Sequence, residues 1–472
     1  MQVYPDSIVA SESYIVTSTK HVKHFSQLIT TSVFYFILGV LIAMPALPIK
    51  KLLMDNLHAQ PAEMAFIFSM MTIPWALKPL YGLLSDSCPI RGQRRRPYII
   101  IGMLTNSLVW LYLAAIEETA GIAIVSTLML FSSITLVLAD VASDTFLVEK
   151  AQLESIADSG KWQSLAWSFR ACGAMIGAGL AGIVLDHTEF GIGFLLNLSG
   201  LSSLVACSSA MLMYEPVVEH GQFQIDLSRR LADLIAFWKT PDIWRTSVFV
   251  AMFACSPSSG DTVFFFMRRR LGFSMDFLGV LSVMRYASSM AGAVVYRQYL
   301  RQKPYNSLLR WTITSAFIVS LSTICLVERW NTMIGFPDQL FVFGDTMIMA
   351  VCSEVAMMPI IISAARISPQ GSEGIVYASI ISISNLSSMV SEASGGWLTH
   401  SLGITKDDFS NLWLLILICS VSTLLPLPFV HFVPELGSIG DYGSLPKMSS
   451  DSDSESIQLT KNGTPTPSSI LI

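Results

Sequence analysis

Four charged side chains lie inside segments that are otherwise apolar. Asp140 and Asp144 are four residues apart, so a helix would place both carboxylates on one face. Arg170 lies about two turns inside a helical segment, and Lys78 is flanked on both sides by apolar residues. Cations at such positions suit the binding of an organic anion, and paired carboxylates suit the binding of a proton or a cation.

Each of these groups also has a plain structural interpretation. Two carboxylates this close cannot both ionise comfortably in a low-dielectric setting, so they should share a proton or be neutralised by a cation. They can equally be a structural pair that bonds helix-end groups, and Arg170 can form a salt bridge between neighbouring helices. The sequence leaves open whether Asp140 and Asp144 couple protons or only support the fold.

Ring faces and a further cation could complete such a site. Arg285 is the sharpest charged candidate in the second half of the chain, and the aromatic residues stand beside the cations in sequence. Aromatic residues in helices are also commonly packing residues. The predicted substrate-binding residues are Lys78, Arg170, Arg285, Trp75, Trp167 and Tyr286. The predicted proton-coupling residues are Asp140 and Asp144.

The composition excludes a soluble globular protein. Of 472 residues, 52% are apolar and 13% are charged, against roughly 25% charged residues in soluble domains, and the mean hydropathy is +0.56. No basic footprint for nucleic acid is present, and the scattered cysteines show no spacing for metal ligands. Gly177–Gly182 matches GxGxxG, but in the middle of a helix it predicts close helix packing. We predict no cofactor, no metal and no enzymatic activity.

Twelve apolar stretches are long enough to cross about 30 Å of hydrocarbon. Their centres lie near residues 39, 71, 107, 135, 173, 202, 254, 287, 317, 352, 386 and 420. The longest internal polar connection divides them into six plus six. We predict an all-α membrane protein with a cytoplasmic N-terminal segment (1–28), a six-helix half (29–214), a cytoplasmic linker (215–240), a second six-helix half (241–436) and a disordered cytoplasmic tail (437–472).

Basic residues are distributed unevenly between alternate loops. With both termini inside, the cytoplasmic segments hold sixteen Lys and Arg residues before the tail, and the opposite loops hold seven, Lys50 among them. Four arginines lie within Arg91–Arg96, which is typical of a short cytoplasmic loop. The run Arg268–Arg270 is the one cluster on the opposite side. The distribution predicts that both termini are cytoplasmic.

One helix, a basic turn and a second helix form the most specific pattern in the chain. The pattern comprises Ile73-Pro74-Trp75, Lys78-Pro79-Leu80-Tyr81-Gly82, Ser85-Asp86, Pro89-Ile90, Gly92 and Arg94-Arg95-Arg96-Pro97-Tyr98. It resembles the signature of the folate-biopterin transporter family, a branch of the major facilitator superfamily. Gln93 departs from it, because an aromatic residue is expected before the arginines. Weaker resemblances cover Asp140–Glu149, Gly160–Gln163 and Pro369–Gly374 with Tyr377 and Asn385.

The resemblance implies the major facilitator fold, with twelve transmembrane helices in two six-helix halves, and transport of folates or pterins across a lipid bilayer. The paired carboxylates Asp140 and Asp144 favour protons as the coupling ion. It places Asp86, Arg94, Arg95, Arg96, Gln163, Glu373 and Asn385 in gating or structural motifs. Glu373 also fits as an acid favoured by the free amides of a first helical turn. Transport of another organic anion, or a receptor or scaffold that keeps the fold without transport, remain the alternatives.

Overall fold

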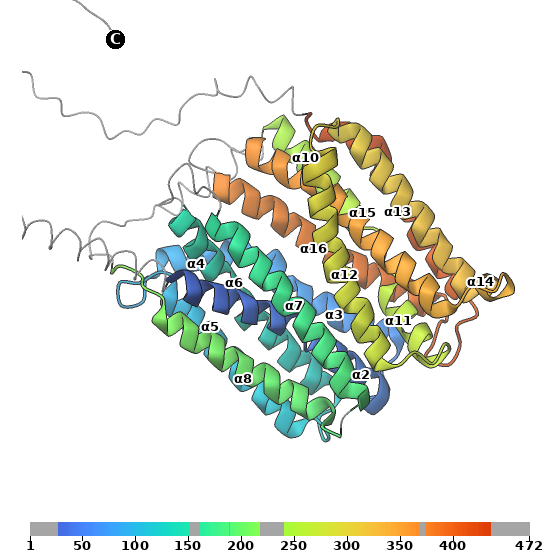
Figure 1. Cartoon of the computed structure of the whole chain (residues 1–472), viewed down its shortest axis with the longest axis horizontal. Coiled ribbons are helices and arrows are strands. Elements are labelled where there is room, and N and C mark those ends of the chain that lie inside the picture. Colours follow the sequence, from blue (N-terminus) through green and yellow to red (C-terminus); the bar gives the residue numbers. More distant parts are fainter. Residues whose placement is uncertain (1–26, 152–160, 188, 218–239, 368–372, 436–472) are drawn as a thin grey trace, which may run out of the picture.

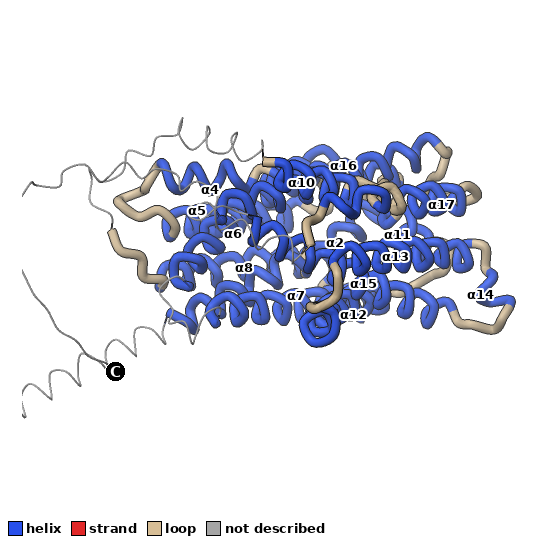
Figure 2. Tube along the Cα trace, turned by 90° about the horizontal axis from the view of Figure 1, so that it is seen from above, coloured by secondary structure: helices blue, strands red, loops and turns tan. Residues whose placement is uncertain are grey.

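The computed structural model of the chain is a bundle of helices. It describes residues 27–151, 161–187, 189–217, 240–367 and 373–435. The predicted tail, nearly all of the predicted N-terminal segment and most of the predicted linker lie outside the described residues. Within the described residues no strand is present, and the one isolated bridge joins Ile90 and Gln93 (Figure 2).

The first group of helices begins with the span Gln27–Asn56. The later part of this span contains α2 (Ala46–Lys51) and a π-helical turn (Leu52–Asn56). The group continues with α3 (Pro61–Ala76), α4 (Lys78–Ser87), α5 (Arg96–Ile116), α6 (Ile122–Ala151), α7 (Lys161–His187) and α8 (Gly191–Leu212), which lie together in Figure 1.

The second group fills the other side of Figure 1. It consists of α10 (Pro241–Ala254), α11 (Gly260–Arg269), α12 (Met275–Val295) with a π-helical turn (Tyr296–Leu300), α13 (Tyr305–Val327), α14 (Trp330–Met333), α15 (Asp338–Ile367), α16 (Glu373–Ser401), α17 (Leu412–Ser422) and a 3₁₀ turn (Leu427–Phe432).

The surface of the bundle suits a membrane. Large apolar side chains such as Leu108, Leu212 and Ile318 are more than half exposed, at 59%, 74% and 59%, which a lipid-facing surface requires. Among the described residues, nine helices are long and apolar enough to cross a membrane. Each of the twelve predicted centres lies in a described helix, while the count of twelve spans stays a prediction.

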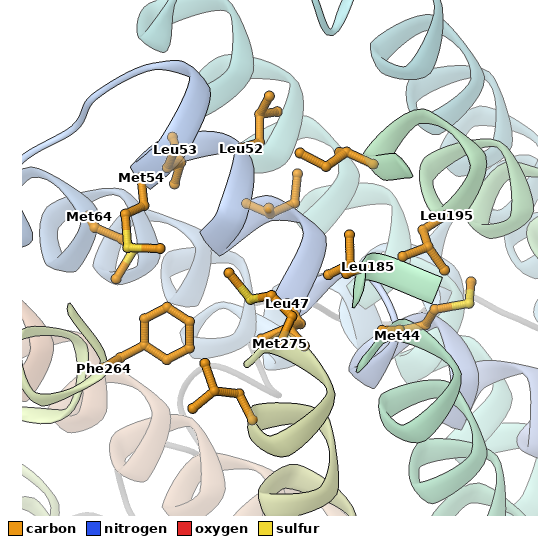
Figure 3. Packing of buried hydrophobic residues seen from close by; sticks show 14 of the residues in the cluster. Met44, Leu47, Leu52, Leu53, Met54, Met64, Leu185, Leu195, Phe264 and Met275 are labelled. Carbon is orange, nitrogen blue, oxygen red and sulfur yellow. The ribbon is translucent and has the colours of Figure 1, made fainter. Parts of the chain in front are cut away.

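One hydrophobic cluster joins the two groups at one end of the bundle. Met44 and Leu53 of the first span and Leu185 of α7 pack with Phe264 of α11 and Met275 of α12 (Figure 3). Burial of apolar surface from both groups holds them together here. We call this end the sealed end.

The opposite end carries the arginine-rich turn, and we call it the basic-loop end. Ile90 and Gln93 exchange backbone hydrogen bonds of 2.9 and 3.0 Å, and the residues between them, Arg91 and Gly92, have φ of 53° and 75°. Two positive φ values in a two-residue loop are the signature of a type I′ turn. The turn directs the following arginines to the start of α5.

Toward the basic-loop end, each group has a hydrophobic cluster of its own. Tyr35, Phe146 and Trp162 belong to one in the first group, whereas Phe249 and Tyr305 belong to one in the second. Each group therefore packs as a unit on this side. The sealed end is where their cores merge.

Close helix packing between the groups depends on small residues. A Cβ added to Gly182 of α7 would lie 2.9 Å from the Cα of Gly279 of α12, and one added to Gly179 would lie 3.3 Å from Val283. The prediction that the GxGxxG pattern serves helix packing is confirmed. Such contacts let two helix backbones approach closely in a membrane.

The arginine run near the sealed end has local partners. Arg269 pairs with Asp55 at 3.3 Å, and Arg268 donates to the Phe273 carbonyl at 2.9 Å. Both lie in the last turn of α11, where the helix dipole favours positive charge. These contacts explain why Arg268 and Arg269 lie at the sealed end, although the other loops on that side carry few basic residues.

Candidate functional site

Four charges meet inside the first group of helices. The Lys78 ammonium is 2.7 Å from Oδ2 of Asp140 and 4.0 Å from Oδ2 of Asp144. Nη1 of Arg170 is 2.9 Å from Oδ1 of Asp140. α4, α6 and α7 thus bring two cations and two acids together, and the formal charges cancel. We call these residues the four-charge cluster.

The cluster is graded in exposure. The Asp140 side chain is fully buried, while Lys78 and Asp144 expose 18% and 35% of their side chains. Further along α6, toward its end, Glu149 exposes 45% of its side chain. Exposure therefore increases toward the basic-loop end, and a solute entering from that end would meet Asp144 and Lys78 before Asp140.

Tyr35 of the first span completes the cluster. Its hydroxyl donates to Oδ1 of Asp144 at 2.9 Å, and the side chain is fully buried. Asp144 therefore has a neutral hydrogen-bond donor, whereas Asp140 has two cations. No signal in the sequence predicts this contact, because Tyr35 and Asp144 are 109 residues apart and a tyrosine in an apolar stretch is common.

Two prolines position Lys78. Pro74 lies inside α3 and Pro79 near the start of α4, and a proline within a helix interrupts its hydrogen bonding. Pro79 has no N–H to bond the Trp75 carbonyl one turn earlier. Nδ2 of Asn385 in α16 donates to that carbonyl at 3.0 Å. The break before Lys78 is thus stabilised by a side chain of the second group.

Two glycines position Arg170. A Cβ added to Gly39 would lie 1.9 Å from the Arg170 carbonyl oxygen, and one added to Gly173 would lie 1.9 Å from that of Phe36. Both distances are impossible for a real side chain, so the first span and α7 approach backbone to backbone at this level. This approach fixes the helix segment from which Arg170 reaches Asp140.

Two of the predicted aromatic residues cover the cations of the cluster. The Lys78 ammonium lies 4.8 Å from the centre of the Trp75 ring, and the Arg170 guanidinium lies 5.3 Å from that of Trp167. Cation–π contacts of this kind are favourable at such distances. They place two ring faces beside the two cations.

Arg285 and Tyr286 lie in the facing helix of the second group. The Arg285 guanidinium is 4.9 Å from the centre of the Tyr286 ring, and Tyr286 packs against Ala174 and Ala178 of α7. Ala174 lies one turn beyond Arg170. The structure therefore sets Tyr286 beside the same helix, but of the described residues the four-charge cluster itself contains no member of the second group.

Arg95 organises the basic-loop end. Its guanidinium donates to Ser85 Oγ at 2.7 Å and to Glu149 at 3.0 Å, and it also binds Asp86. These contacts join the end of α4 to the end of α6. Arg95 is almost fully buried, which is unusual for an arginine and here is compensated by partners on two helices.

An acid that sequence reasoning assigned to the linker belongs to this arrangement. The Glu215 carboxylate accepts backbone N–H groups of Arg94, Arg95 and Arg96 at 2.8 to 3.1 Å, and the Arg96 guanidinium binds the Met211 carbonyl. An acid at the free amides of a helix start is favourable. The helix start of α5 is thus tied to the end of α8.

The second group repeats this device. Glu435 accepts the backbone N–H groups of Tyr305 and Asn306 at the start of α13, at 2.8 and 2.9 Å. In each group an acid that follows the last long helix caps the start of another helix of the same group.

The remaining predicted motif residues are less informative. Gln163 lies exposed in the first turn of α7. Glu373 is the first residue of α16, but its side chain and residues 368–372 of its motif lie outside what is described. Within the described residues, no group of three or more His, Cys, Asp and Glu could hold a metal ion.

A second charged group lies at the interface between the two groups of helices. Lys50 of α2 pairs with Asp261 of α11 at 2.7 Å, and Glu392 of α16 lies by Thr72 of α3. Lys50 was expected in a loop, but the helix containing it extends to Asn56. The prediction that Lys50 lies in a loop is therefore wrong. The helix tolerates this lysine because Asp261 of the other group compensates its charge.

Known proteins share this fold. A mutant of the nucleoside transporter NupG superimposes with a TM-score of 0.68 at 11% identity, over 86% of this chain and all of that one. The D-xylose–proton symporter gives 0.63 at 13% identity, over 87% of this chain and 98% of the other. These likenesses identify the major facilitator fold.

Proteins with similar sequences identify the family to which the chain belongs. The chain is 32% identical over 400 residues to the folate-biopterin transporter of Synechocystis sp., covering 85% of this chain and 80% of that protein. It is 29% identical to the probable folate-biopterin transporter 2 of Arabidopsis thaliana, covering 85% and 81%, and 26% identical to the putative folate transporter 2 of Plasmodium berghei, covering 86% and 88%. The profile of the BT1 family matches residues 39–450. With its helical bundle and its buried charges, the chain is a multi-pass membrane protein that belongs to the BT1 family.

Proposed function

We propose that the chain is a secondary transporter that moves folates or pterins across a membrane by alternating access, with protons as the coupling ion. The observation that carries the proposal is the four-charge cluster, which lies inside a major facilitator bundle and becomes more exposed toward one end. Buried charges in a membrane bundle are costly and mark solute or ion pathways. The relatives named as folate and folate-biopterin transporters give the substrate class.

The two cations of the cluster can exchange partners. Lys78 and Arg170 both bind Asp140, so a substrate carboxylate that enters from the basic-loop end competes with Asp140 for them. Trp75 and Trp167 lie over the same cations and are placed to stack on a flat ring. Arg285 and Tyr286 would approach from the second group when the two groups close on this side.

Charge balance links substrate to protons. Without substrate, two cations balance two acids, and neither acid needs a proton for neutrality. A folate carboxylate adds one negative charge in a poorly solvated place, and a proton on Asp140 or Asp144 restores the balance. Substrate and proton would then favour each other's binding, which is the linkage that a symporter needs.

The distribution of basic residues supports one orientation in the membrane. We place the basic-loop end and both termini in the cytoplasm, following the excess of Lys and Arg there, and the sealed end on the opposite side. In this orientation the structure corresponds to an inward-facing state. Residues 29–214 and 241–436 are the two halves that would rock against each other around the cluster.

Uptake into vesicles tests this function. Purified protein in proteoliposomes should accumulate labelled folate, folinate or biopterin, and more so when the outside is acidic. Lys78→Ala should abolish accumulation, whereas Lys303→Ala, an exposed lysine beyond α12, should behave as wild type. Accumulation of another organic anion alone would change the substrate class. Failure of wild type to move any anion, despite correct folding, would favour a receptor or scaffold.

A further inference from the structure

The sealed end contains a charged group whose charges do not balance. Lys50 of the first helical group faces Asp261 and Glu392 of the second, which gives one cation and two acids. The Lys50 ammonium lies 5.2 Å from the ring centre of Phe68 and 4.7 Å from that of Phe264. An aromatic residue from each helical group thus encloses the cation.

Glu392 has a poor set of partners for a carboxylate. Its Oε2 is 3.3 Å from the Thr72 hydroxyl, and that hydroxyl is also 3.2 Å from the Phe68 carbonyl. A threonine hydroxyl has one proton, which in a helix is commonly given to the carbonyl four residues earlier. An ionised Glu392 would receive at most a shared bond.

A protonated Glu392 satisfies every group. Its own O–H then donates to the Thr72 oxygen, and the Thr72 proton remains available for the Phe68 carbonyl. An ionised carboxylate at this depth, without a cation of its own, would be costly. The geometry therefore matches the neutral acid.

The charged surroundings of Glu392 are limited. Among the described residues, Asp261 and Lys50 are the charged groups that act on it. From α3, the facing group is the uncharged Thr72, while Glu63 binds the backbone of its own first turn. One neighbouring charge repels an ionised Glu392, and the opposite charge is already paired.

On the other helices that pack against α16, the charged side chains named below have partners other than Glu392 or lie far from it along the helix. Lys78 of α4 binds Asp140. On α15, Asp345 and Glu354 accept hydrogen bonds from Ser322 of α13 and Ser289 of α12. α10 has its charged side chains near its first turn, at the basic-loop end, and α17 has no acidic or basic side chain.

The backbone fixes both acids to one unit. α10 and α11 are separated by a break at residues 255–259, and the N–H of Ser258 there donates to the Ser391 carbonyl at 3.0 Å. A Cβ added to Gly395 would lie 1.9 Å from the Ser258 carbonyl oxygen. Asp261 and Glu392 therefore move together, while Lys50 and Thr72 belong to the other group.

We propose that Glu392 is a proton-binding site of the sealed end, and that loss of its proton favours opening of that end. The sealed conformation binds the proton more tightly than an opened one would, because water solvates an ionised Glu392 once the groups separate. By linkage, proton binding favours sealing and proton loss favours opening. The proposal deepens the proposed symport function and rests on it.

The test needs no substrate, so it is independent of whether the chain transports folates. Ala59 is fully buried in the cluster of the sealed end. A cysteine in Ala59→Cys should react with an impermeant maleimide, added to intact cells on the sealed side, only when this end opens. Thiols themselves become more reactive as pH rises, so each rate is divided by that of Met333→Cys, a position that is 79% exposed. The unmodified chain gives the background from native cysteines.

The normalised rate should rise about fivefold or more between roughly pH 5.5 and pH 8. Adding Glu392→Gln, which mimics the neutral acid, should keep it low and independent of pH. Asp345→Asn is the matched control, because it neutralises a partly buried acid that bonds a serine within one group, and it should leave the pH dependence intact. Persistence of the pH dependence in Glu392→Gln, or its absence in Ala59→Cys itself, would overturn the proposal.

Discussion

The four-charge cluster and the group around Lys50 differ in charge balance and in location. The first pairs two cations with two acids within one group of helices, whereas the second sets one cation against two acids across the interface of both groups. A balanced cluster is ready to exchange an internal anion for an external one. An unbalanced cluster at an interface responds to a proton by changing how the two groups fit together.

The largest effect is expected for Lys78→Ala. Truncating one partner of a buried, hydrogen-bonded charge pair costs about 2–5 kcal/mol of binding free energy, and each 1.4 kcal/mol corresponds to about a tenfold change. We expect folate uptake to fall about 100-fold or more, while Arg170 still pairs with Asp140 and limits unfolding. Uptake and thermal unfolding of the same preparation should be measured together. Normal uptake would remove Lys78 from the substrate site.

Gly173→Leu should disturb the same cluster without changing any charge. A side chain there collides with the Phe36 carbonyl, so the first span and α7 must separate and move Arg170 away from Asp140. We expect uptake to fall by roughly tenfold or more, as overpacking costs about 1–3 kcal/mol or more. Gly344→Leu is the control, since no atom lies within 4 Å of its Cβ position. Equal uptake in both variants would show that the close approach is not needed.

Substituting each of the two aspartates should distinguish their effect on thermal stability from their effect on proton coupling. Asp140→Asn leaves two cations without their shared acid, whereas Asp144→Asn keeps an oxygen for the Tyr35 hydroxyl. We expect the larger loss of thermal stability in Asp140→Asn. In both variants concentrative uptake should lose its pH dependence while exchange between equilibrated sides continues. If exchange falls as far as concentrative uptake, the pair serves structure or substrate binding instead.

Of these variants, Asp261→Asn should have the smallest effect. It changes the group around Lys50 and not the four-charge cluster. The change removes the partner of Lys50 across the sealed end, and buried apolar contacts from both groups remain. We expect the Ala59→Cys labelling rate to rise by a few fold at low pH, with exchange of substrate preserved. A partly exposed ion pair contributes up to about 1 kcal/mol. An unchanged labelling rate would mean that apolar packing alone seals this end.

The sequence predicts the four-charge cluster much better than the group around Lys50. Charges within apolar stretches are rare enough that Lys78, Asp140, Asp144 and Arg170 stand out individually. Which acid takes both cations depends on the approach of α4, α6 and α7, and that approach is set by contacts far apart in the sequence. Tyr35 illustrates the limit, since nothing in its neighbourhood distinguishes it from other tyrosines of apolar stretches.

The sequence does not predict the site around Lys50, and the reason is different. Lys50 lies near the end of an apolar stretch, where a lysine is typical of a loop or a helix end. Its role depends on Asp261, 211 residues away, and on a break between α10 and α11 that an apolar stretch does not reveal. The helical architecture, in contrast, follows from hydropathy alone, because each predicted centre falls in a described helix.

Proton uptake on substrate binding tests the central claim most directly, namely that a substrate carboxylate displaces Asp140 and is balanced by a proton. Folate is added to purified protein in weakly buffered detergent solution, and a pH indicator reports the protons bound. Wild type should take up protons as folate binds, whereas the double variant Asp140→Asn with Asp144→Asn should bind folate without taking up protons. Equal proton uptake in both proteins, or binding by wild type with no proton uptake at any pH, would contradict the account.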